Sequence, residues 1–488
     1  MEMTHLSEWL PKPGELLEFV PVARTVAAVA PTSVATVPAS FIQEFHIRYW
    51  HGRRLASAPE ELADNVRNEL SMCFSMAVPL DRVALRQAYT EYLRRHDSLR
   101  CWFDIAESPE TPLVGHVLDP EAVELATVSL GSFDSSEELR DRLGVRFQTP
   151  DPTGWPAFTL GAIDHGMDGF TVYVSFDHAF TDGTSLVASI FEVHQLYTAF
   201  AADREPELPP VTGYAEYARQ ERDTVAAQPP ELERLAQILA DNVDNIRPTP
   251  WELGLAPGEF GDSTGTRYDL LTGDEVNAFT EVCAANGDSF ASGLYAAIAL
   301  TELELAGRTR YLGLNVVGTR LDPRFQFTQG WFINLVPVAF EVGEAARFTE
   351  LVGRARGALN DIKPLSGIPL LAALRRATEL TGGREFPQVR DWPWVSYMDM
   401  RPISGAMLEQ SLPGLNGIRG LSSSSRIGQP SPLWFNREHD RVHVAVMFPD
   451  TAIAHASVNE YLDRLRTVCR SIATAGEYGT VPVGSEAT

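Results

Sequence analysis

The sequence is poor in cysteine and has no long uninterrupted apolar run. Its 488 residues include four cysteines, far apart and without a CxxC pair, so we expect four buried thiols in a reducing compartment. The apolar stretch at residues 20–37 is broken by Arg24 and Pro31 and is too short to cross a bilayer. The N-terminus also lacks a cationic start followed by an apolar core, so we expect no signal peptide and a cytoplasmic protein.

Positive charge is scarce as well. The chain has 40 Lys and Arg against 65 Asp and Glu, a net charge of -25. This balance argues against nonspecific nucleic-acid binding and against docking on an anionic membrane, since both need excess positive charge. The densest basic run, RYWHGRR at residues 48–54, could bind phosphate groups or an acidic protein, but a solvated helix end explains it better.

Motifs for metals and nucleotide cofactors are missing. The sequence contains no HExxH, no GxGxxG and no P-loop, and no Cys or His cluster has zinc spacing. His439 and His443 are four residues apart, but they lie on a strand pattern. We therefore expect no metal and no bound cofactor.

Two serine motifs resemble hydrolase signatures but have the wrong context. GDSTG at residues 261–265 fits GxSxG, which requires a strand before it and a helix after it. Here a loop precedes the motif and the strand-like TRYDLL follows. In GDSF at residues 287–290, Asp288 or Ser289 is better explained as a helix cap. We therefore predict no serine nucleophile.

The pattern along the chain is mixed strand and helix, which predicts an α/β fold. A chain of this length exceeds what one hydrophobic core usually serves, so we expect two domains. The polar, proline-containing stretch AADREPELPP at residues 201–210 looks like a linker. We therefore predict domains at 1–210 and 211–488.

The segment YVSFDHAFTDG carries the strongest chemical signal. An apolar strand ends at His178, Asp182 begins the turn into the next helix, and Gly183 is expected to permit a tight backbone there. If the backbone or an acid holds one ring nitrogen of His178, the other nitrogen can act as a base near neutral pH. A structural histidine at the strand end is the alternative.

HxxxDG, found here at residues 178–183, is the signature of the chloramphenicol-acetyltransferase-like superfamily, which includes the condensation domains of nonribosomal peptide synthetases. YLRRHDSLRCWF, GTRLDP and GWFINLVPV resemble further motifs of that superfamily and occur in its order. Within it, the chain most resembles actinobacterial polyketide-associated acyltransferases of the trehalose-ester type. The stretches LSEWLPKPGELLEF, VSYMDMRPIS and residues 433–462 carry this likeness.

The resemblance implies an α/β fold of two chloramphenicol-acetyltransferase-like domains. These would form a V-shaped pseudo-dimer with an interdomain tunnel, and a crossover segment would lie near residues 400–435. The resemblance also implies a monomeric, polyketide-associated enzyme of natural-product or lipid biosynthesis.

The resemblance also implies a mechanism. His178 Nε2 would remove a proton from the hydroxyl of a sugar, polyol or natural product. The resulting alkoxide would attack an acyl thioester, carried by coenzyme A or by a carrier-protein pantetheine arm, without a covalent enzyme intermediate. Asp182 and Arg320 would form a structural ion pair, and Gly183 would be needed for backbone conformation.

Substrate contacts and the acceptor stay open. Trp331, Asn334, Ser396 and Tyr397 are candidates for substrate binding, and core packing explains each about equally well. Peptide condensation domains usually carry HHxxxDG, whereas Asp177 replaces the first histidine here; this favours ester formation. The alternatives are a stand-alone amide-forming condensation enzyme and a catalytically silent scaffold that positions carrier proteins.

Overall fold

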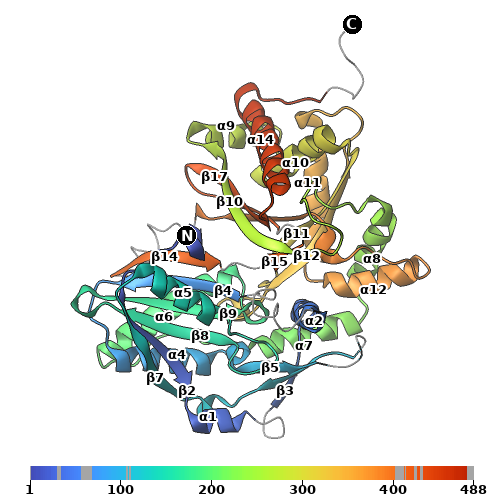
Figure 1. Ribbon diagram of the computed structural model, residues 1–488. Helices are drawn as coiled ribbons and strands as arrows, with labels where there is room; N and C mark the ends of the chain where they lie inside the picture. Colours follow the sequence, from blue (N-terminus) through green and yellow to red (C-terminus); the bar gives the residue numbers. More distant parts are fainter. Residues whose placement is uncertain are drawn as a thin grey trace. The chain divides into compact units, whose positions relative to one another are not determined.

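The computed structural model describes residues 2–29, 35–56, 69–105, 108, 111–401, 412, 414–422, 426–428 and 432–480. The chain forms two compact units (Figure 1). Unit 1 comprises Met1–Ala226, Arg320–Ile333 and Ile403–Ser425, and unit 2 comprises Ala227–Thr319, Asn334–Pro402 and Arg426–Thr488.

Unit 1 is built on a seven-stranded sheet. The pairs between neighbouring strands are antiparallel except for β1 with β14, which is parallel. In spatial order the strands are β1 (Glu2–His5), β14 (Leu415–Ser422), β4 (Glu69–Met76), β9 (Phe170–Asp177), β8 (Phe158–Asp164), β2 (Gly14–Pro21) and β7 (Leu125–Phe133). A smaller sheet contains β3 (Ala35–Pro38), β6 (Val114–Val117) and β5 (Cys101–Asp104).

Strand β9 is buried along its whole length because both of its faces are covered. Val172 and Val174 pack in the core with helices α4 and α6, while Tyr173 packs on the other side with residues of helix α5. A sheet covered on both faces needs continuous rather than alternating apolar strands. The unit 1 helices are α1 (Ala23–Ala28), α2 (Phe41–Ala56), α4 (Arg82–Arg95), α5 (Ser136–Phe147), α6 (Gly183–Ala201) and α7 (Tyr214–Ala226).

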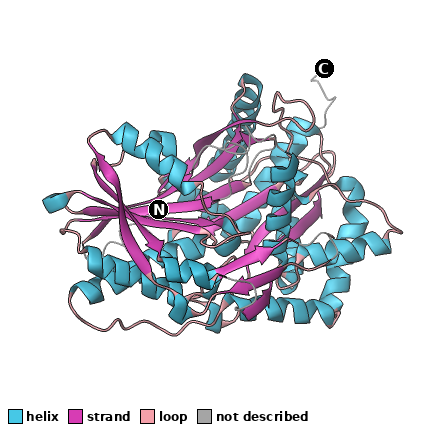
Figure 2. Cartoon of the chain, turned by 60° about the horizontal axis from the view of Figure 1, so that its bottom comes forward, coloured by secondary structure: helices cyan, strands magenta, loops and turns pink. Residues whose placement is uncertain are grey.

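Unit 2 has its own seven-stranded sheet and its own core. The strands are, in spatial order, β12 (Ile333–Glu341), β11 (Arg310–Gly318), β13 (Trp394–Asp399), β16 (Leu433–Arg437), β17 (Arg441–Pro449), β10 (Gly261–Thr272) and β15 (Arg426–Ile427). The helices are α8 (Pro230–Asn242), α9 (Asp274–Ala285), α10 (Phe290–Ala306), α11 (Phe348–Ile362), α12 (Leu370–Leu380) and α14 (Ala452–Ala475). Figure 2 shows helices against the strands, as the predicted α/β class requires.

The serine and cysteine predictions agree with the structure. Ser263 lies inside β10, opposite Pro449 of β17, so GDSTG has no strand-to-helix turn. Ser289 caps α10 by accepting a hydrogen bond from the Ser292 amide. All four cysteines are buried free thiols. Within the described residues, no helix is long and apolar enough to cross a membrane.

The unit boundary differs from the one expected at residue 210. Helix α7 belongs to unit 1, because Asp97 accepts hydrogen bonds from the amides of Tyr214 and Ala215 at the start of that helix. Two later segments, 320–333 and 403–425, also belong to unit 1. The second contains β14 and overlaps the crossover expected near 400–435, of which residues 402–411, 413, 423–425 and 429–431 lie outside the described part.

Candidate active site

His178 lies directly after β9, at the start of a short 3-10 turn, His178–Phe180. The ring is half-buried, and its Nδ1 lies 3.0 Å from the carbonyl oxygen of Thr181. Because a carbonyl can only accept, this bond requires the proton on Nδ1. The neutral ring therefore has Nε2 as its basic nitrogen, which is the arrangement a general base needs.

Side chains from three different segments hold the turn that carries His178. Asp177 Oδ1 accepts from the Ala179 amide at 2.8 Å, and Gln43 Nε2 of α2 donates to the Ala179 carbonyl at 2.8 Å. Gln329 Nε2 donates to the Phe180 carbonyl at 3.2 Å. These bonds fix the backbone after His178, and strand β9 fixes the backbone before it. The position of the imidazole is therefore restricted, which is a requirement for efficient proton transfer.

The Asp182 side chain is only 6% exposed, and its carboxylate contacts three polar partners. It caps α6 by accepting from the Ser185 amide at 2.6 Å and accepts from the Phe332 amide at 2.9 Å. The Arg320 guanidinium lies 3.1 Å from Oδ1 and stacks 4.0 Å from the centre of the Phe332 ring. Burial lowers the pKa of Arg320, and the attraction of Asp182 opposes that shift. Asp182 thus ties segment 320–333 to the motif helix.

Gly183 corrects one expectation from the sequence. It is the first residue of α6, is not among the glycines with positive φ, and a Cβ built on it would meet no atom within 4 Å. The backbone at this position therefore does not require glycine. What glycine provides here is open space beside the motif.

Trp331 lies against His178. The ring centroids are 4.0 Å apart at an interplanar angle of 32°. The backbone around the indole is fixed by Tyr214 Oη, which donates to the Trp331 carbonyl at 2.7 Å, and by Ser185 Oγ, which donates to the Gly330 carbonyl at 2.7 Å. Any side chain at Gly330 would collide with the Tyr214 ring, so the glycine of GWFIN is needed for close packing.

The other three candidates belong to unit 2. The Asn334 amide is occupied by backbone: Nδ2 donates to the Ser366 and Ile368 carbonyls, and Oδ1 accepts from the Leu370 amide at 3.1 Å. Asn334 therefore holds the start of α12.

Ser396 is buried in β13 opposite Trp434. Tyr397 stacks on Phe290 with ring centroids 5.8 Å apart, and burial raises the pKa of its phenol. The surroundings of both residues within unit 2 are those of packed side chains.

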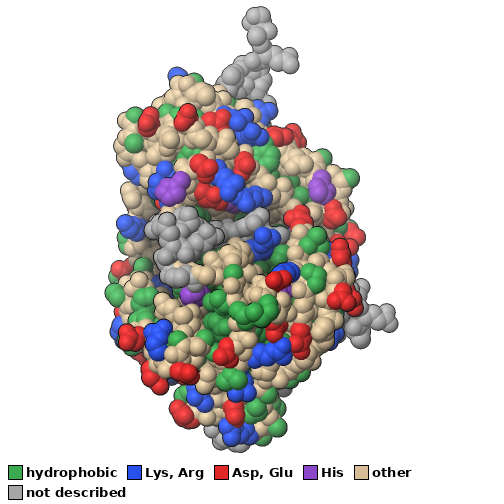
Figure 3. All heavy atoms as spheres, turned by 90° about the vertical axis from the view of Figure 1, so that its left-hand side faces the viewer, with side chains coloured by type: hydrophobic (Ala, Val, Ile, Leu, Met, Phe, Trp, Pro, Cys, Tyr) green, Lys and Arg blue, Asp and Glu red, His purple; other side chains and the backbone are tan. Residues whose placement is uncertain are grey.

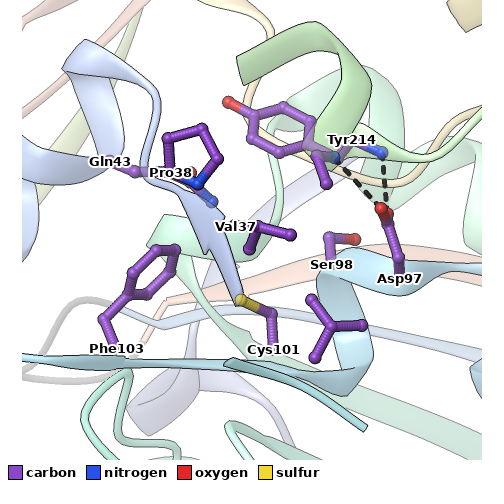
Figure 4. Close-up of a pocket in the computed structure, with 10 residues that line it drawn as sticks. Val37, Pro38, Gln43, Asp97, Ser98, Cys101, Phe103 and Tyr214 are labelled. Atoms are coloured by element: carbon purple, nitrogen blue, oxygen red, sulfur yellow. Dashed lines mark hydrogen bonds between the residues drawn. The ribbon is translucent and has the colours of Figure 1, made fainter. Parts of the chain in front are cut away.

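Several residues that shape this site were assigned no role by the sequence analysis. His96 and Ser98 of the RRHDSLR stretch both hold Gln329: His96 Nδ1 accepts from its amide at 3.2 Å, and Ser98 Oγ donates to its carbonyl at 2.7 Å. Asp97, between them, caps α7 beside a small cavity that Val37 and Cys101 help to line (Figure 4). The resemblance of RRHDSLR to a family motif was the sequence feature that pointed to these three residues. No sequence feature pointed to Gln43 of α2.

Neither clustered metal ligands in the described part of the chain nor a patch of one charge on the face in Figure 3 marks a second site. In the described part of the chain, no group of three or more His, Cys, Asp or Glu residues could hold a metal ion. On the face shown in Figure 3, basic side chains are interspersed with acidic ones. In RYWHGRR, Arg48 pairs with Glu44 one helical turn earlier in α2. Because Glu44 is buried, this charge pair belongs to the packed side of α2 rather than to a solvated helix end.

The comparisons with known proteins agree with this geometry. The family model for the condensation domain matches residues 63–386. The chain belongs to the condensation-domain family. The acyltransferase PapA3 of Mycobacterium tuberculosis is 29% identical over 486 residues, covering 98% of both chains. The 2'-acyl-2-O-sulfo-trehalose (hydroxy)phthioceranyltransferase PapA1 of Mycobacterium bovis is 27% identical, covering 98% of this chain and 89% of that protein.

A solved structure of the PapA2 acyl transferase superposes with a TM-score of 0.83 at 25% identity, covering 97% of this chain and all of that one. The predicted superfamily and fold class are therefore confirmed, and this condensation-domain protein is an acyltransferase.

Proposed function

We propose that the protein transfers an acyl group from a thioester to a sugar hydroxyl, with His178 as general base. The observation that carries this proposal is the hydrogen bond from His178 Nδ1 to the Thr181 carbonyl, which makes Nε2 the basic nitrogen. Proton transfer by a positioned imidazole contributes about 10²–10⁴-fold to rate.

The steps balance without any further co-reactant. His178 Nε2 accepts the hydroxyl proton as the oxygen attacks the thioester carbonyl. The tetrahedral adduct then collapses, the carbon–sulfur bond breaks, and the thiolate takes the proton from the imidazolium. The products are an ester and a free thiol, carried by coenzyme A or by a carrier-protein pantetheine arm, and no enzyme-bound acyl group is formed.

Similarity to the named relatives supports a sugar acceptor. PapA1 is named for an acyl-sulfo-trehalose, and trehalose carries only hydroxyl nucleophiles. Asp177, which stands where peptide condensation domains usually carry a histidine, agrees with an ester product. We therefore propose trehalose or a trehalose derivative as the acceptor of the acyl group.

The test is incubation of the purified protein with palmitoyl-CoA and, separately, trehalose, trehalose 2-sulfate and an amino acid, followed by mass spectrometry and by colorimetry of the released thiol. We expect an acyl ester of a trehalose acceptor. We expect His178→Ala to reduce the rate at least about 100-fold without lowering the melting temperature.

His116→Ala is the matched control. His116 is buried, contacts Asp104 at 2.6 Å and stacks on Trp102. Like His178 it lies against a tryptophan, but it belongs to the small sheet. Full activity of His178→Ala would refute the base assignment. Acylation of the amino acid alone would replace the ester proposal with amide formation.

A further inference from the structure

A second buried imidazole lies close to His178. His46 of α2 is 2% exposed, and its ring centroid is 6.0 Å from that of His178. Its Nε2 lies 3.3 Å from Oδ1 of Asp177, whose side chain is also 2% exposed. The contact is close enough for an ion pair, but it is not aligned as a hydrogen bond.

The Asp177 carboxylate is buried and therefore needs polar partners. A buried carboxylate is costly unless it is paired or hydrogen-bonded. The Ala179 amide supplies one donor at 2.8 Å, and the His46 imidazole supplies a second polar contact from a different element. Asp177 precedes His178 directly, so any shift of its carboxylate moves the turn that carries the base.

His46 also contacts the other surface beside His178. Its ring meets the Trp331 indole edge-on, with centroids 5.1 Å apart and an interplanar angle of 86°. Trp331 in turn lies against His178. Edge-to-face aromatic pairs contribute packing energy and fix orientation. One imidazole therefore touches both the carboxylate before His178 and the indole against it.

We propose that His46 is a positioning residue for His178: paired with Asp177 and packed edge-on against Trp331, it fixes the turn and the indole between which the base is oriented. This proposal rests on the proposed role of His178. It also gives a reason for the aspartate at position 177, because its carboxylate is the group that His46 contacts.

The kinetic test compares wild type with His46→Leu, His46→Gln and Asp177→Asn, using palmitoyl-CoA and trehalose. We expect His46→Leu to lower kcat about 10- to 100-fold, the range expected for a small displacement of reacting groups, with KM changed less than about threefold. His46→Gln keeps an N–H donor and should recover most of kcat. His116→Gln is the control and should match wild type.

A double-mutant cycle tests whether His46 acts through Asp177. The loss in the double variant His46→Leu/Asp177→Asn should be well below the product of the two single losses, since coupled residues are not additive. Fully multiplicative losses, or an unchanged kcat in His46→Leu, would overturn the proposal while leaving the function of His178 intact.

A measurement without substrate separates this proposal from the proposed function. In protein labelled with ¹⁵N-histidine, the ring shifts of His178, assigned from their loss in His178→Gln, report which nitrogen carries the proton. We expect wild type to show one Nδ1–H form and His46→Leu to show a mixture of tautomers or broadened signals. Identical His178 signals in a folded His46→Leu variant would overturn the positioning role.

Discussion

Removal of the Asp182 carboxylate should destabilise unit 1 more than the loss of a helix cap can explain. Asp182→Ala breaks the ion pair with Arg320, removes the α6 cap and leaves the Phe332 amide without its acceptor. Breaking one side of a buried ion pair costs about 3–5 kcal/mol, because the remaining charge stays buried. A helix cap alone contributes about 1 kcal/mol.

Asp81→Ala provides the matched control. Asp81 caps α4 by accepting from the amides of Val83 and Ala84, but it is exposed and forms no ion pair among the described contacts. We expect its replacement to cost about 1 kcal/mol. The difference between the two variants isolates the contribution of the buried charge and of the Phe332 contact.

Urea denaturation followed by circular dichroism measures both variants. With a slope of about 2 kcal/mol/M, the unit 1 transition of Asp182→Ala should shift downward by about 2 M. Hydrogen exchange at the Phe332 amide should accelerate in the same variant. The double variant Asp182→Ala/Arg320→Ala should lose less than the sum of the single losses, since no unpaired charge remains. Equal shifts for Asp182→Ala and Asp81→Ala would refute the reasoning.

Three further predictions concern other positions. Burial raises the pKa of Glu221 to about 7. The stability that the protonated carboxyl contributes is therefore fully present below the unfolded pKa near 4.5 and is lost as the pH rises through about 7. Glu221→Gln should remove this pH dependence and raise the free energy of unfolding at pH 8 by on the order of 3 kcal/mol, measured by urea titration at pH 5 and pH 8. Asn334→Leu should destabilise unit 2 by about 2–4 kcal/mol, because it leaves buried backbone groups unpaired, and hydrogen exchange should increase at Leu370; an unchanged melting temperature with a raised KM would favour substrate binding instead. Gly183→Ala should leave the melting temperature within about 2 °C, since a Cβ meets no atom there, while kcat/KM falls if substrate uses the open space; a large loss of stability would restore the conformational role.

The local parts of the site were predictable from the sequence because they are continuous in the chain. The strand before His178, the turn that begins at Asp182 and helix α6 occupy one run of residues, and apolar periodicity together with turn residues identifies such runs. The same reasoning rejected Ser263 as a nucleophile and placed Asp288 or Ser289 at a helix cap, where the structure has Ser289.

The contacts that orient His178 could not be predicted in this way because they join distant parts of the chain. His46 precedes the motif by 132 residues, and Trp331 follows it by 153, as their numbers show. A buried histidine in an amphipathic helix has no local pattern that separates it from an ordinary core residue. The return of segment 320–333 to unit 1 is likewise invisible to periodicity, since the strands on either side of it belong to unit 2.

The separate motifs of this family are parts of one hydrogen-bonded assembly in unit 1. His96 and Ser98 hold the backbone of Gln329, and the Gln329 side chain donates to the Phe180 carbonyl in the turn that carries His178. Asp182 closes the same assembly by accepting from the Phe332 amide. A polar network of this kind is stable only when its members are satisfied together, so the loss of one motif should disturb the others. Motifs that are far apart in the sequence thus lie close together in the fold. The turn at His178 and the segment that bears Trp331 hold each other in place through these hydrogen bonds.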